Sequence, residues 1–512
     1  MTGQPSDAAP TVVEAVAQVA AGLRVFGIGH PGKLSHMLAY ALPRHGLTPA
    51  AAIIGAGVVW GDAVALTDRW GDVTYAELAS ATGRVAAGLI PELGTRARVG
   101  IMIGDDRYFL VALGAACLNG ARMVMLNPRL GSDDLSSVID QQHLDVIIAS
   151  PGANLVGFGG RVIFTDSFTA MDAVGGVPNL ARRSRMVMLT GGTTRAPSPI
   201  KLKRRASAAL PMLALAGVTD VRNGLPTLIC APLFHGYGLA CAMLCLIAGS
   251  PMVLSSACRD ASPAGLDKGK VAPGWGEAIA LAIRQYQVHT VFAVPAQLRS
   301  LALFLNGHPS RDDKECVAAI VSGADRLDAS TIEAIERRWG PVVVNYYGTT
   351  ESGTATMIAG AALAQHPESL GRPVAGCRIR IVGASGNLVP RGTVGRVQVC
   401  SPMTSVGPGT SFTTNDLGWM DDDGFLYMSG RAGRKLRLGG EFVDLASVEA
   451  VVGQIDGVDA ARAFVVDDQV MGQRVAIEVA SSIELDAEAV RAVVRERLGP
   501  ASVPVAVTTV QS

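Results

Sequence analysis

Glycine and threonine residues gather directly after a strand-like run of the sequence. The apolar run 185–189 is followed by five small or hydroxyl-bearing residues: Thr190, Gly191, Gly192, Thr193 and Thr194. Glycine allows the backbone to approach a ligand closely, and backbone amides and hydroxyl groups together suit phosphate oxygens. The segment is not a P-loop, because no Gly-Lys-Ser/Thr sequence closes it. Taken alone, it favours a phosphate site only slightly over an ordinary strand-ending turn.

A second polar segment follows the apolar run 342–347. Tyr347 offers a ring face against which a purine can stack, and Thr350 offers a hydroxyl group. Glu351 carries a carboxylate suited to Mg²⁺, a hard ion that prefers oxygen ligands. By itself this segment fits a polar strand-to-loop turn better than a nucleotide site.

A third segment, 413–449, carries charged residues with complementary uses. Asp416 can accept two hydrogen bonds from the neighbouring hydroxyls of a ribose, as acidic residues do in dinucleotide-binding folds. Arg431 can make a planar, bidentate contact with an anion. The acidic run 421–423 and the glycine after it indicate a solvated hairpin turn, to which we assign no function.

The elements that must position these residues follow an α/β pattern. Apolar, β-branched runs alternate with helix-length segments, which predicts βαβ units and mainly parallel sheets: 99–104, 123–126, 145–150, 161–164, 185–189, 227–231, 290–294 and 342–347. From about residue 371, short alternating strands punctuated by glycine predict an antiparallel, barrel-like part. After Arg431 a compact unit is expected, with a helix capped by Asp486 that ends at residues 498–499.

Composition excludes several classes of protein. The chain has 512 residues, which implies at least two domains, and its Lys+Arg and Asp+Glu counts are both 44, so net charge favours neither nucleic acid nor an anionic membrane. Eight scattered cysteines without C-x-x-C spacing indicate a reduced, cytoplasmic protein. No secretory signal is apparent, and the apolar stretch 49–60 is too short to span a bilayer. Residues 12–60 fit a helical extension packed on the body better than a peripheral membrane contact.

The order of motifs along the chain resembles the adenylate-forming (AMP-binding) superfamily. The sequences TGGTT, APLFHGYGL (231–239), YYGTTE, TNDLG, GRAGRK and LGGEFV occur in that order, and the resemblance covers roughly residues 65–510. The pattern is most similar to actinobacterial fatty acyl-CoA synthetases. It implies an α/β fold with a large N-terminal domain, 1–430, which contains a helical extension, 1–60, and a barrel-like part, 370–430. A hinge at 431–436 and a small mobile α+β domain at 437–512 would follow.

The resemblance also implies ATP, Mg²⁺ and coenzyme A as cofactors and a carboxylic acid, such as a fatty acid, as substrate. It places residues 190–194 at the ATP phosphates and Glu351 at Mg²⁺. The adenosine would lie against Tyr347, Gly348 and Thr349, with Thr350 at a phosphate, Asp416 at the ribose and Arg431 at the ribose or α-phosphate. The residues with a catalytic role would be Thr194, His235, Glu351 and Arg431.

For each of three further matches, a functional and a structural interpretation both stay open. His235 matches a position beside the reacting carboxylate, but a core or helix-capping histidine is an equal alternative. Ser322, Gly323 and Ala324 match a segment that lines the acyl and adenine pocket, and as small residues they also suit packing. Gly439 and Gly440 match the loop of the pantetheine tunnel, and a tight turn is their alternative.

The chain departs from the family pattern at three places. Arg195 and Ser198 stand where similar proteins carry glycine and lysine, and Lys201 or Lys203 could replace the lost charge only if the loop slipped. Arg434 stands at the hinge, where similar proteins usually carry an acidic residue or a lysine. The chain ends at Ser512, before the loop that supplies a lysine to the adenylation step, and loss of one such preorganised charge is expected to slow that step by about 10²–10³-fold.

These departures keep three functions in view. The first is an AMP-forming acyl-CoA synthetase, impaired in adenylation. The second is a non-catalytic homologue that binds nucleotide or acyl ligand, and the third is an acyl-AMP ligase that loads a carrier protein. The motifs indicate neither which acid is the substrate nor what the oligomeric state is.

Overall fold

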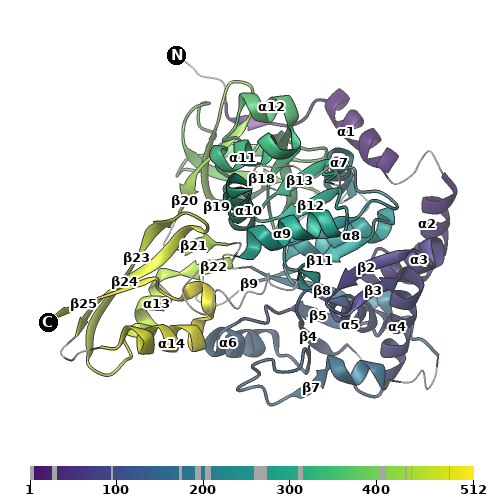
Figure 1. Cartoon of the computed structure of the whole chain (residues 1–512), viewed down its shortest axis with the longest axis horizontal. Coiled ribbons are helices and arrows are strands. Elements are labelled where there is room, and N and C mark those ends of the chain that lie inside the picture. The colour runs from purple at the N-terminus through teal and green to yellow at the C-terminus, as the bar shows by residue number, and fades with distance from the viewer. Residues whose placement is uncertain are drawn as a thin grey trace.

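The computed structural model has a large mixed α/β body and a small C-terminal unit packed against one side of it (Figure 1). It describes residues 5–25, 31–93, 96–171, 176–190, 198–201, 209–258, 274–308, 315–403, 411–432, 435–439, 441–481, 483 and 485–511.

The larger sheet of the body carries nine strands within the described part of the chain. Their order is β16-β15-β14-β13-β12-β10-β11-β2-β3, and the strands from β14 to β2 run parallel. The strands are β2 (Val64–Asp68), β3 (Gly71–Thr74), β10 (Thr227–Ile229), β11 (Met252–Leu254), β12 (Thr290–Ala293), β13 (Ala319–Ser322), β14 (Val343–Thr349), β15 (Gly353–Ala359) and β16 (Arg372–Pro373). The expected parallel arrangement is confirmed.

A second sheet has the order β7-β6-β4-β5-β8-β9, and all but its last pair are parallel. The strands are β4 (Arg98–Met102), β5 (Arg122–Met125), β6 (Val146–Ala149), β7 (Arg161–Phe164), β8 (Arg185–Thr190) and β9 (Ser198–Lys201). The apolar runs predicted from the sequence form these strands, because residues buried on both faces are apolar in a parallel sheet that helices cover.

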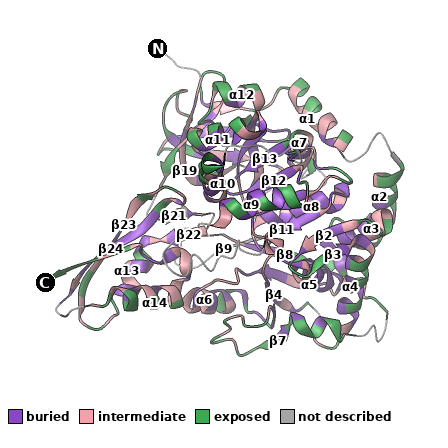
Figure 2. Ribbon diagram, in the orientation of Figure 1, coloured by how far each residue is buried: buried purple, intermediate pink, exposed green. Residues whose placement is uncertain are grey.

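Helices cover the two sheets, and their facing sides form the main cores (Figure 2). The largest core joins α3, α4, α5 and α8 to both sheets. The helices are α1 (Val12–Val25), α2 (Pro31–His45), α3 (Pro49–Trp60), α4 (Tyr75–Gly88), α5 (Arg107–Leu118), α6 (Ser132–Gln142), α7 (Ala209–Thr219), α8 (Gly236–Ala248), α9 (Gly274–Gln285), α10 (Pro295–Gly307), α11 (Ala329–Trp339) and α12 (Gly360–Gln365). Cys241 and Cys245 are buried on α8, as small hydrophobic residues of a core helix are.

The change of pattern predicted near residue 371 is confirmed. An antiparallel sheet with the order β1-β17-β18-β19-β20 follows that point, and its first strand comes from the N-terminus. Its strands are β1 (Asp7–Ala8), β17 (Arg378–Val382), β18 (Gly395–Cys400), β19 (Ser411–Met420) and β20 (Leu426–Arg431).

The C-terminal unit has a core of its own. Its elements are β21 (Lys435–Leu438), β22 (Glu441–Asp444), α13 (Leu445–Val452), β23 (Val458–Asp468), β24 (Gly472–Ser481), α14 (Ala487–Leu498) and β25 (Ala506–Gln511). Asp486 caps α14 by accepting a hydrogen bond from the backbone N–H of Glu488 at 2.9 Å, and Gly499 follows the last residue of the helix, as the sequence predicts.

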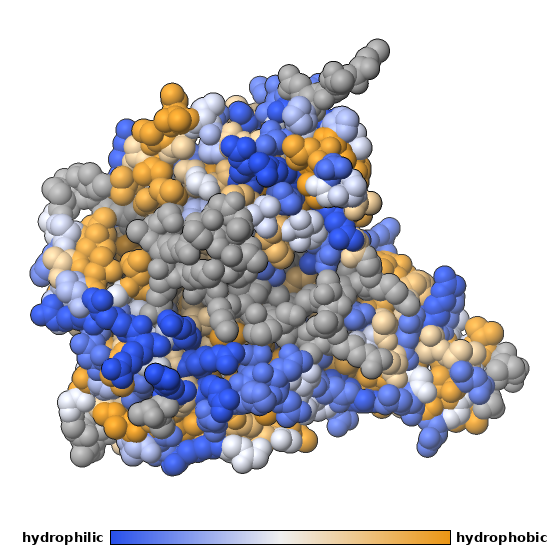
Figure 3. Space-filling view, turned by 180° about the vertical axis from the view of Figure 1, so that it is seen from behind, coloured by the Kyte–Doolittle hydropathy of each residue, from blue (hydrophilic) through white to orange (hydrophobic). Residues whose placement is uncertain are grey.

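The N-terminal helices differ in how deeply they pack. Helix α3 is largely buried and contacts α4, α5 and α8, so the apolar stretch at 49–60 belongs to the core. Helix α1 packs on α7 but exposes Val12, Val13 and Val16. Viewed from behind, apolar atoms gather at the end of the molecule that carries these helices (Figure 3). None of the helices in the described residues is long and apolar enough to cross a membrane. The packing of α1 and α3 agrees with the helical extension that the sequence favours over a peripheral membrane contact.

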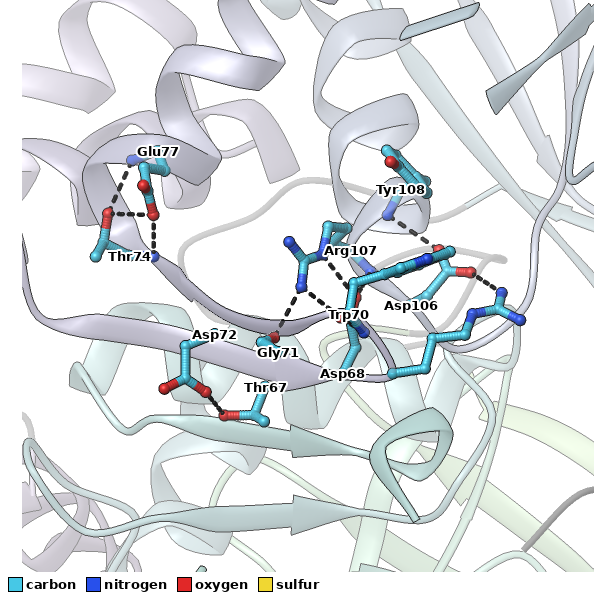
Figure 4. Close-up of polar contacts among 11 residues, drawn as sticks. Thr67, Asp68, Trp70, Gly71, Asp72, Thr74, Glu77, Asp106, Arg107 and Tyr108 are labelled. Atoms are coloured by element: carbon cyan, nitrogen blue, oxygen red, sulfur yellow. Dashed lines mark hydrogen bonds and ion pairs between the residues drawn. The ribbon is translucent and has the colours of Figure 1, made fainter. Parts of the chain in front are cut away.

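A cluster of charges joins the β2–β3 hairpin to the start of α5 (Figure 4). Asp68 is fully buried and receives hydrogen bonds from the backbone N–H and the guanidinium of Arg107, both at 2.9 Å. Asp106 caps α5 through the N–H of Tyr108 and is paired with the half-exposed Arg69 at 2.7 Å. Burial raises the pKa of Asp106 to about 6, although the Arg69 guanidinium acts against this shift.

The raised pKa of Asp106 makes stability depend on pH. Between pH 4 and 6 the folded chain retains this proton and the unfolded chain has lost it, so stability falls as pH rises through that window, by up to about 3 kcal/mol. The substitution Asp106→Asn keeps a capping side chain but cannot ionise. We expect the difference between the Tm of this variant and the Tm of the parent protein to increase as the pH is raised from about 4 to about 6.

The matched control is Asp486→Asn, the same replacement at an exposed helix N-cap. Thermal unfolding of all three proteins from pH 4 to 7 makes the comparison. An Asp106→Asn curve parallel to that of the parent protein contradicts the prediction.

Candidate functional site

A cleft of about 790 Å³ lies where the body and the C-terminal unit meet. The carboxyl ends of β13 and β14 form its floor, helices α10 and α11 one side, and strands β19 and β20 another. The turn between β23 and β24 closes it from the C-terminal unit. Five of the residues singled out in the sequence line this one cleft: Ala324, Tyr347, Gly348, Asp416 and Arg431.

The Asp416 carboxylate lies where two sheets meet, and residues of both sheets contact it. The Tyr347 hydroxyl on β14 donates a hydrogen bond to Oδ2 of Asp416 on β19 at 2.8 Å. Arg431 faces Asp416 across the β19–β20 ladder, and its Nε lies 3.6 Å from Oδ1. The Arg431 guanidinium also lies over the ring of Phe442, 4.8 Å from its centroid. Because each partner fixes one side of the carboxylate, Asp416 is held in place before any ligand binds.

The segment after β13 combines packing with a cleft wall. Ser322 is fully buried, and its hydroxyl has no hydrogen-bond partner among the described residues. A Cβ on Gly323 would lie 2.2 Å from the ring of Tyr346, so only glycine fits there. Ala324 has a positive φ of 74° and lines the cleft. Gly323 is therefore a packing requirement, whereas Ala324 faces the site.

The segment after Gly348 is not part of the cleft lining. The ladder between β14 and β15 shifts register at Gly348, where a Cβ would lie 2.3 Å from the carbonyl oxygen of Gly353. The backbone N–H of Thr349 donates to Ser352 Oγ at 3.2 Å. Thr350 and Glu351 occupy the turn that follows, outside the cleft lining. Among the described residues, no group of three or more His, Cys, Asp or Glu that could bind a metal is found.

His235 lies at the start of α8, near a partly buried ion pair that crosses between the two parts of the protein. It is the N-cap residue, but its side chain makes no capping hydrogen bond. Arg129 of the body pairs with Glu441 of β22. Burial alone would raise the pKa of Glu441, but the positive groups of Arg129 and His235, with hydrogen bonds from Arg129 and Asn127, hold that pKa below its ordinary value.

Several predicted residues cannot be placed. Thr190 ends β8 and pairs with Ser198, but the loop between them lies outside the described residues: Gly191, Gly192, Thr193, Thr194 and Arg195. So do Lys203, Gly433, Arg434 and Gly440. Lys201 pairs with Val187, well before the loop begins, so this register does not bring it to the loop. Gly439 is described, with φ of 57° and its α-carbon packed against Met471.

Comparison with known proteins decides the family. The sequence model of the AMP-binding enzyme family matches residues 56–407, more than half of the chain. This chain belongs to the AMP-binding enzyme family. It is 27% identical over 460 residues to a feruloyl-CoA synthase of an Amycolatopsis species, covering 84% of this chain and 89% of that protein. It is 23% identical to a medium/long-chain fatty-acid–CoA ligase of Mycobacterium tuberculosis, covering 94% and 87%.

The fold of this AMP-binding enzyme is also that of solved structures. The o-succinylbenzoate–CoA synthetase of Bacillus subtilis, as a double mutant bound to a product analogue, has a TM-score of 0.76 at 20% identity, covering 90% of this chain and 95% of that chain. The same synthetase in complex with its acyl-adenylate has a TM-score of 0.65. Both values show that the chain shares the fold of that synthetase.

Sequence reasoning missed part of the cleft of this AMP-binding enzyme. Arg299 on α10, Asp328 at the N-cap of α11 and the turn at 467–473 all line it. The turn itself could be predicted from the sequence, because an Asp-rich segment that ends in glycine separates two strand-like runs. Its position at the cleft was not, since the facing Arg299 is distant in sequence.

The hydrogen bond between Tyr347 and Asp416 generates a prediction for nucleotide binding. Tyr347→Phe keeps the ring but removes the bond that fixes the carboxylate, and a hydrogen bond to a charged group contributes about 1.5–3 kcal/mol. We expect AMP affinity, measured by calorimetry, to fall about tenfold or more. The control is Tyr427→Phe, whose hydroxyl contacts His366 and Asp421 outside the cleft. Equal AMP affinity in the Tyr347→Phe variant and the parent protein refutes the assignment.

Proposed function

We propose that this protein is an AMP-forming acyl-CoA ligase, which activates a carboxylic acid with ATP and transfers the acyl group to coenzyme A. The observation that carries the proposal is the single cleft that gathers Ala324, Tyr347, Asp416 and Arg431 from four separate strands and loops. A purine stacking surface, a carboxylate for ribose hydroxyls and a guanidinium for a phosphate are what a bound AMP group requires. The relatives, most of them acid–CoA ligases, support the same activity.

The nucleotide would lie with its adenine against Tyr347 and Gly348 and its ribose on Asp416. Arg431 would contact the ribose or the α-phosphate. The loop 190–194 would hold the outer phosphates, with Thr194 and Thr350 donating hydroxyl hydrogen bonds. Glu351 would supply one carboxylate to Mg²⁺, whose role when bound is to neutralise phosphate charge.

The reaction then takes two steps. An oxygen of the acid attacks the α-phosphorus of ATP, the bond to the β-phosphate oxygen breaks, and pyrophosphate leaves. The sulfur of coenzyme A next attacks the carbonyl carbon of the acyl-AMP, the carbon–oxygen bond to AMP breaks, and the thiol proton passes to a base or to solvent. Arg431 and His235 position the reacting groups and contribute charge beside them. Positioning and charge stabilisation supply most of the catalysis in such transfer reactions.

The arrangement of the two parts suits the second step. The β21–β22 hairpin, which carries Gly439, contacts the body through the Arg129–Glu441 ion pair. The Arg129 guanidinium in turn lies 5.9 Å from the ring centroid of Phe234, two residues before α8. A second contact joins Arg497 of α14 to Asp133 of α6 at 2.8 Å. The greater likeness to the product-analogue complex than to the adenylate complex supports this reading. We therefore propose that Gly439 and Gly440 line the path of the coenzyme A thiol in this arrangement.

The substrate is proposed only as a class. The relatives include proteins named for feruloyl, fatty-acyl and succinylbenzoyl groups, which share a carboxylate and differ in shape. A fatty acid is the first acid that we would test, because the fatty-acid–CoA ligase of M. tuberculosis aligns with 94% of the chain.

The direct test is a pair of assays with a panel of fatty and aromatic acids. ATP–pyrophosphate exchange measures the first step, and coenzyme A thioester formation measures the whole reaction. We expect thioester product with at least one acid and its loss in the Asp416→Ala variant. Folded protein that binds AMP but turns over no acid in either assay rejects the ligase proposal and favours a binding protein.

The Arg129–Glu441 ion pair gives a separate prediction. Glu441→Gln removes the partly buried negative charge that pairs with Arg129, and this pair joins the two parts only in their present arrangement. We expect thioester formation from synthetic acyl-AMP and coenzyme A to fall about tenfold or more, with ATP–pyrophosphate exchange within about twofold of that of the parent protein. Glu488→Gln, at an exposed ion pair inside the C-terminal unit, is the control. Equal loss in both half-reactions contradicts the prediction.

A further inference from the structure

The turn between β23 and β24 forms a wall of the cleft that the proposed function assigns to AMP. It comes from the C-terminal unit, whereas most of the cleft belongs to the body. Six of its residues line the cleft: Asp467, Asp468, Gln469, Met471, Gly472 and Gln473. A segment of the smaller part therefore covers a ligand site of the larger part.

The turn has a fixed local shape. Oδ1 of Asp468 accepts hydrogen bonds from the backbone N–H groups of Val470 at 2.9 Å and Met471 at 2.8 Å. Gly472, which pairs with Asp468 at the end of the ladder, has a φ of 80°, where side-chain-bearing residues are strained. The carbonyl oxygen of Val470, in the same turn, accepts a hydrogen bond from the body.

Arg299 on α10 receives the turn. Its Nε lies 2.7 Å from Oδ2 of Asp328, and its Nη2 donates to the carbonyl oxygen of Arg326 at 2.6 Å. Its Nη1 donates to the carbonyl oxygen of Val470 at 3.4 Å. The side chain is only 12% exposed, so these contacts hold the guanidinium rigidly. One side chain thus joins the start of α11, the loop after Ala324 and the covering turn.

The fit between Arg299 and the turn is close. A Cβ built on Gly472 would lie 3.0 Å from Nη1 of Arg299 and 3.3 Å from its Cζ. The planar guanidinium therefore lies directly against the glycine backbone, and an added methyl group would push the two apart.

The same turn also touches the segment proposed to deliver the thiol. A Cβ on Gly439 would lie 2.4 Å from the terminal methyl of Met471, which is almost fully buried. Met471 thus packs on the backbone at Gly439 while its neighbour Val470 contacts Arg299. A movement of the turn away from Arg299 would disturb both the cleft and the backbone at Gly439.

We propose that the β23–β24 turn is a cover over the nucleotide cleft and that Arg299 is the positioning residue that holds it shut during acyl transfer. The cover retains the acyl-AMP until the thiol has reacted, and AMP leaves when the turn separates from Arg299. This inference rests on the proposed function, because it takes the nucleotide to lie in this cleft.

The test compares two glycine substitutions in the C-terminal unit. Gly472→Ala introduces a methyl group against Arg299, whereas Gly457→Ala introduces one against Ile483, within the unit itself. Both glycines have positive φ, 80° and 84°, so the backbone strain is matched. The dissociation rate of a fluorescent AMP analogue and the fraction of synthetic acyl-AMP lost to solution before coenzyme A reacts are measured for both variants.

We expect the analogue to leave the Gly472→Ala variant about tenfold faster than the parent protein, with more acyl-AMP lost to solution, and the Gly457→Ala variant to match the parent. Arg299→Lys, which keeps the charge but cannot reach all three partners, should behave like Gly472→Ala. Equal dissociation from the parent and Gly472→Ala proteins, or equal acceleration in both glycine variants, overturns the inference. A parent protein that binds no AMP analogue overturns the proposed function itself.

Discussion

The position of the Asp416 carboxylate is the constraint on which the candidate site depends. Asp416 is not held by its neighbours in sequence alone. It lies between the hydroxyl of Tyr347, at the end of a strand of the nine-stranded sheet, and the guanidinium of Arg431, its cross-strand partner in the antiparallel sheet. The two sheets must therefore meet at a defined distance for the carboxylate to be placed. Their separate cores make each sheet rigid enough to hold that distance.

The contacts between the body and the C-terminal unit are of a different kind. Those that the structure describes include two ion pairs, Arg129 with Glu441 and Arg497 with Asp133. They also include a hydrogen bond from the Arg299 side chain to the carbonyl oxygen of Val470. Each unit keeps its own apolar core. Polar interfaces between domains can open at modest cost, since water can replace each lost partner. The fold thus combines a rigid cleft floor with a wall that can separate from it.

The sequence predicted the elements well because their signals are local. The run 161–164 becomes β7 without a change of bounds, and Asp486 caps its helix as expected. Five members of the cleft were also singled out, but only through a set of ordered motifs, since each motif alone fits a turn. Their grouping in one cavity depends on strand order, which no local pattern encodes.

What the sequence could not show are pairings between distant residues. Gly323 looked equally suited to packing and to ligand contact, and the ring of Tyr346 decides for packing. Arg299 carried no motif at all, because its partners are a carboxylate of α11 and two backbone carbonyls, one of them 171 positions away. A backbone carbonyl leaves no trace in a sequence, so contacts of this type appear only in the folded chain.

Two neighbouring carboxylates show how the body links its sheets at the site. Asp106 caps α5, whereas Asp105 turns to the opposite side and accepts hydrogen bonds from the backbone N–H of Leu233 at 2.7 Å and from the hydroxyl of Ser255 at 3.1 Å. Burial raises the pKa of Asp105, and these two donors and Arg129 oppose that shift. Leu233 begins the short segment that ends at His235. A carboxylate of the six-stranded-sheet region therefore sets where His235 lies, and a change at Asp105 should reach the proposed acyl-transfer centre without touching the proposed nucleotide cleft.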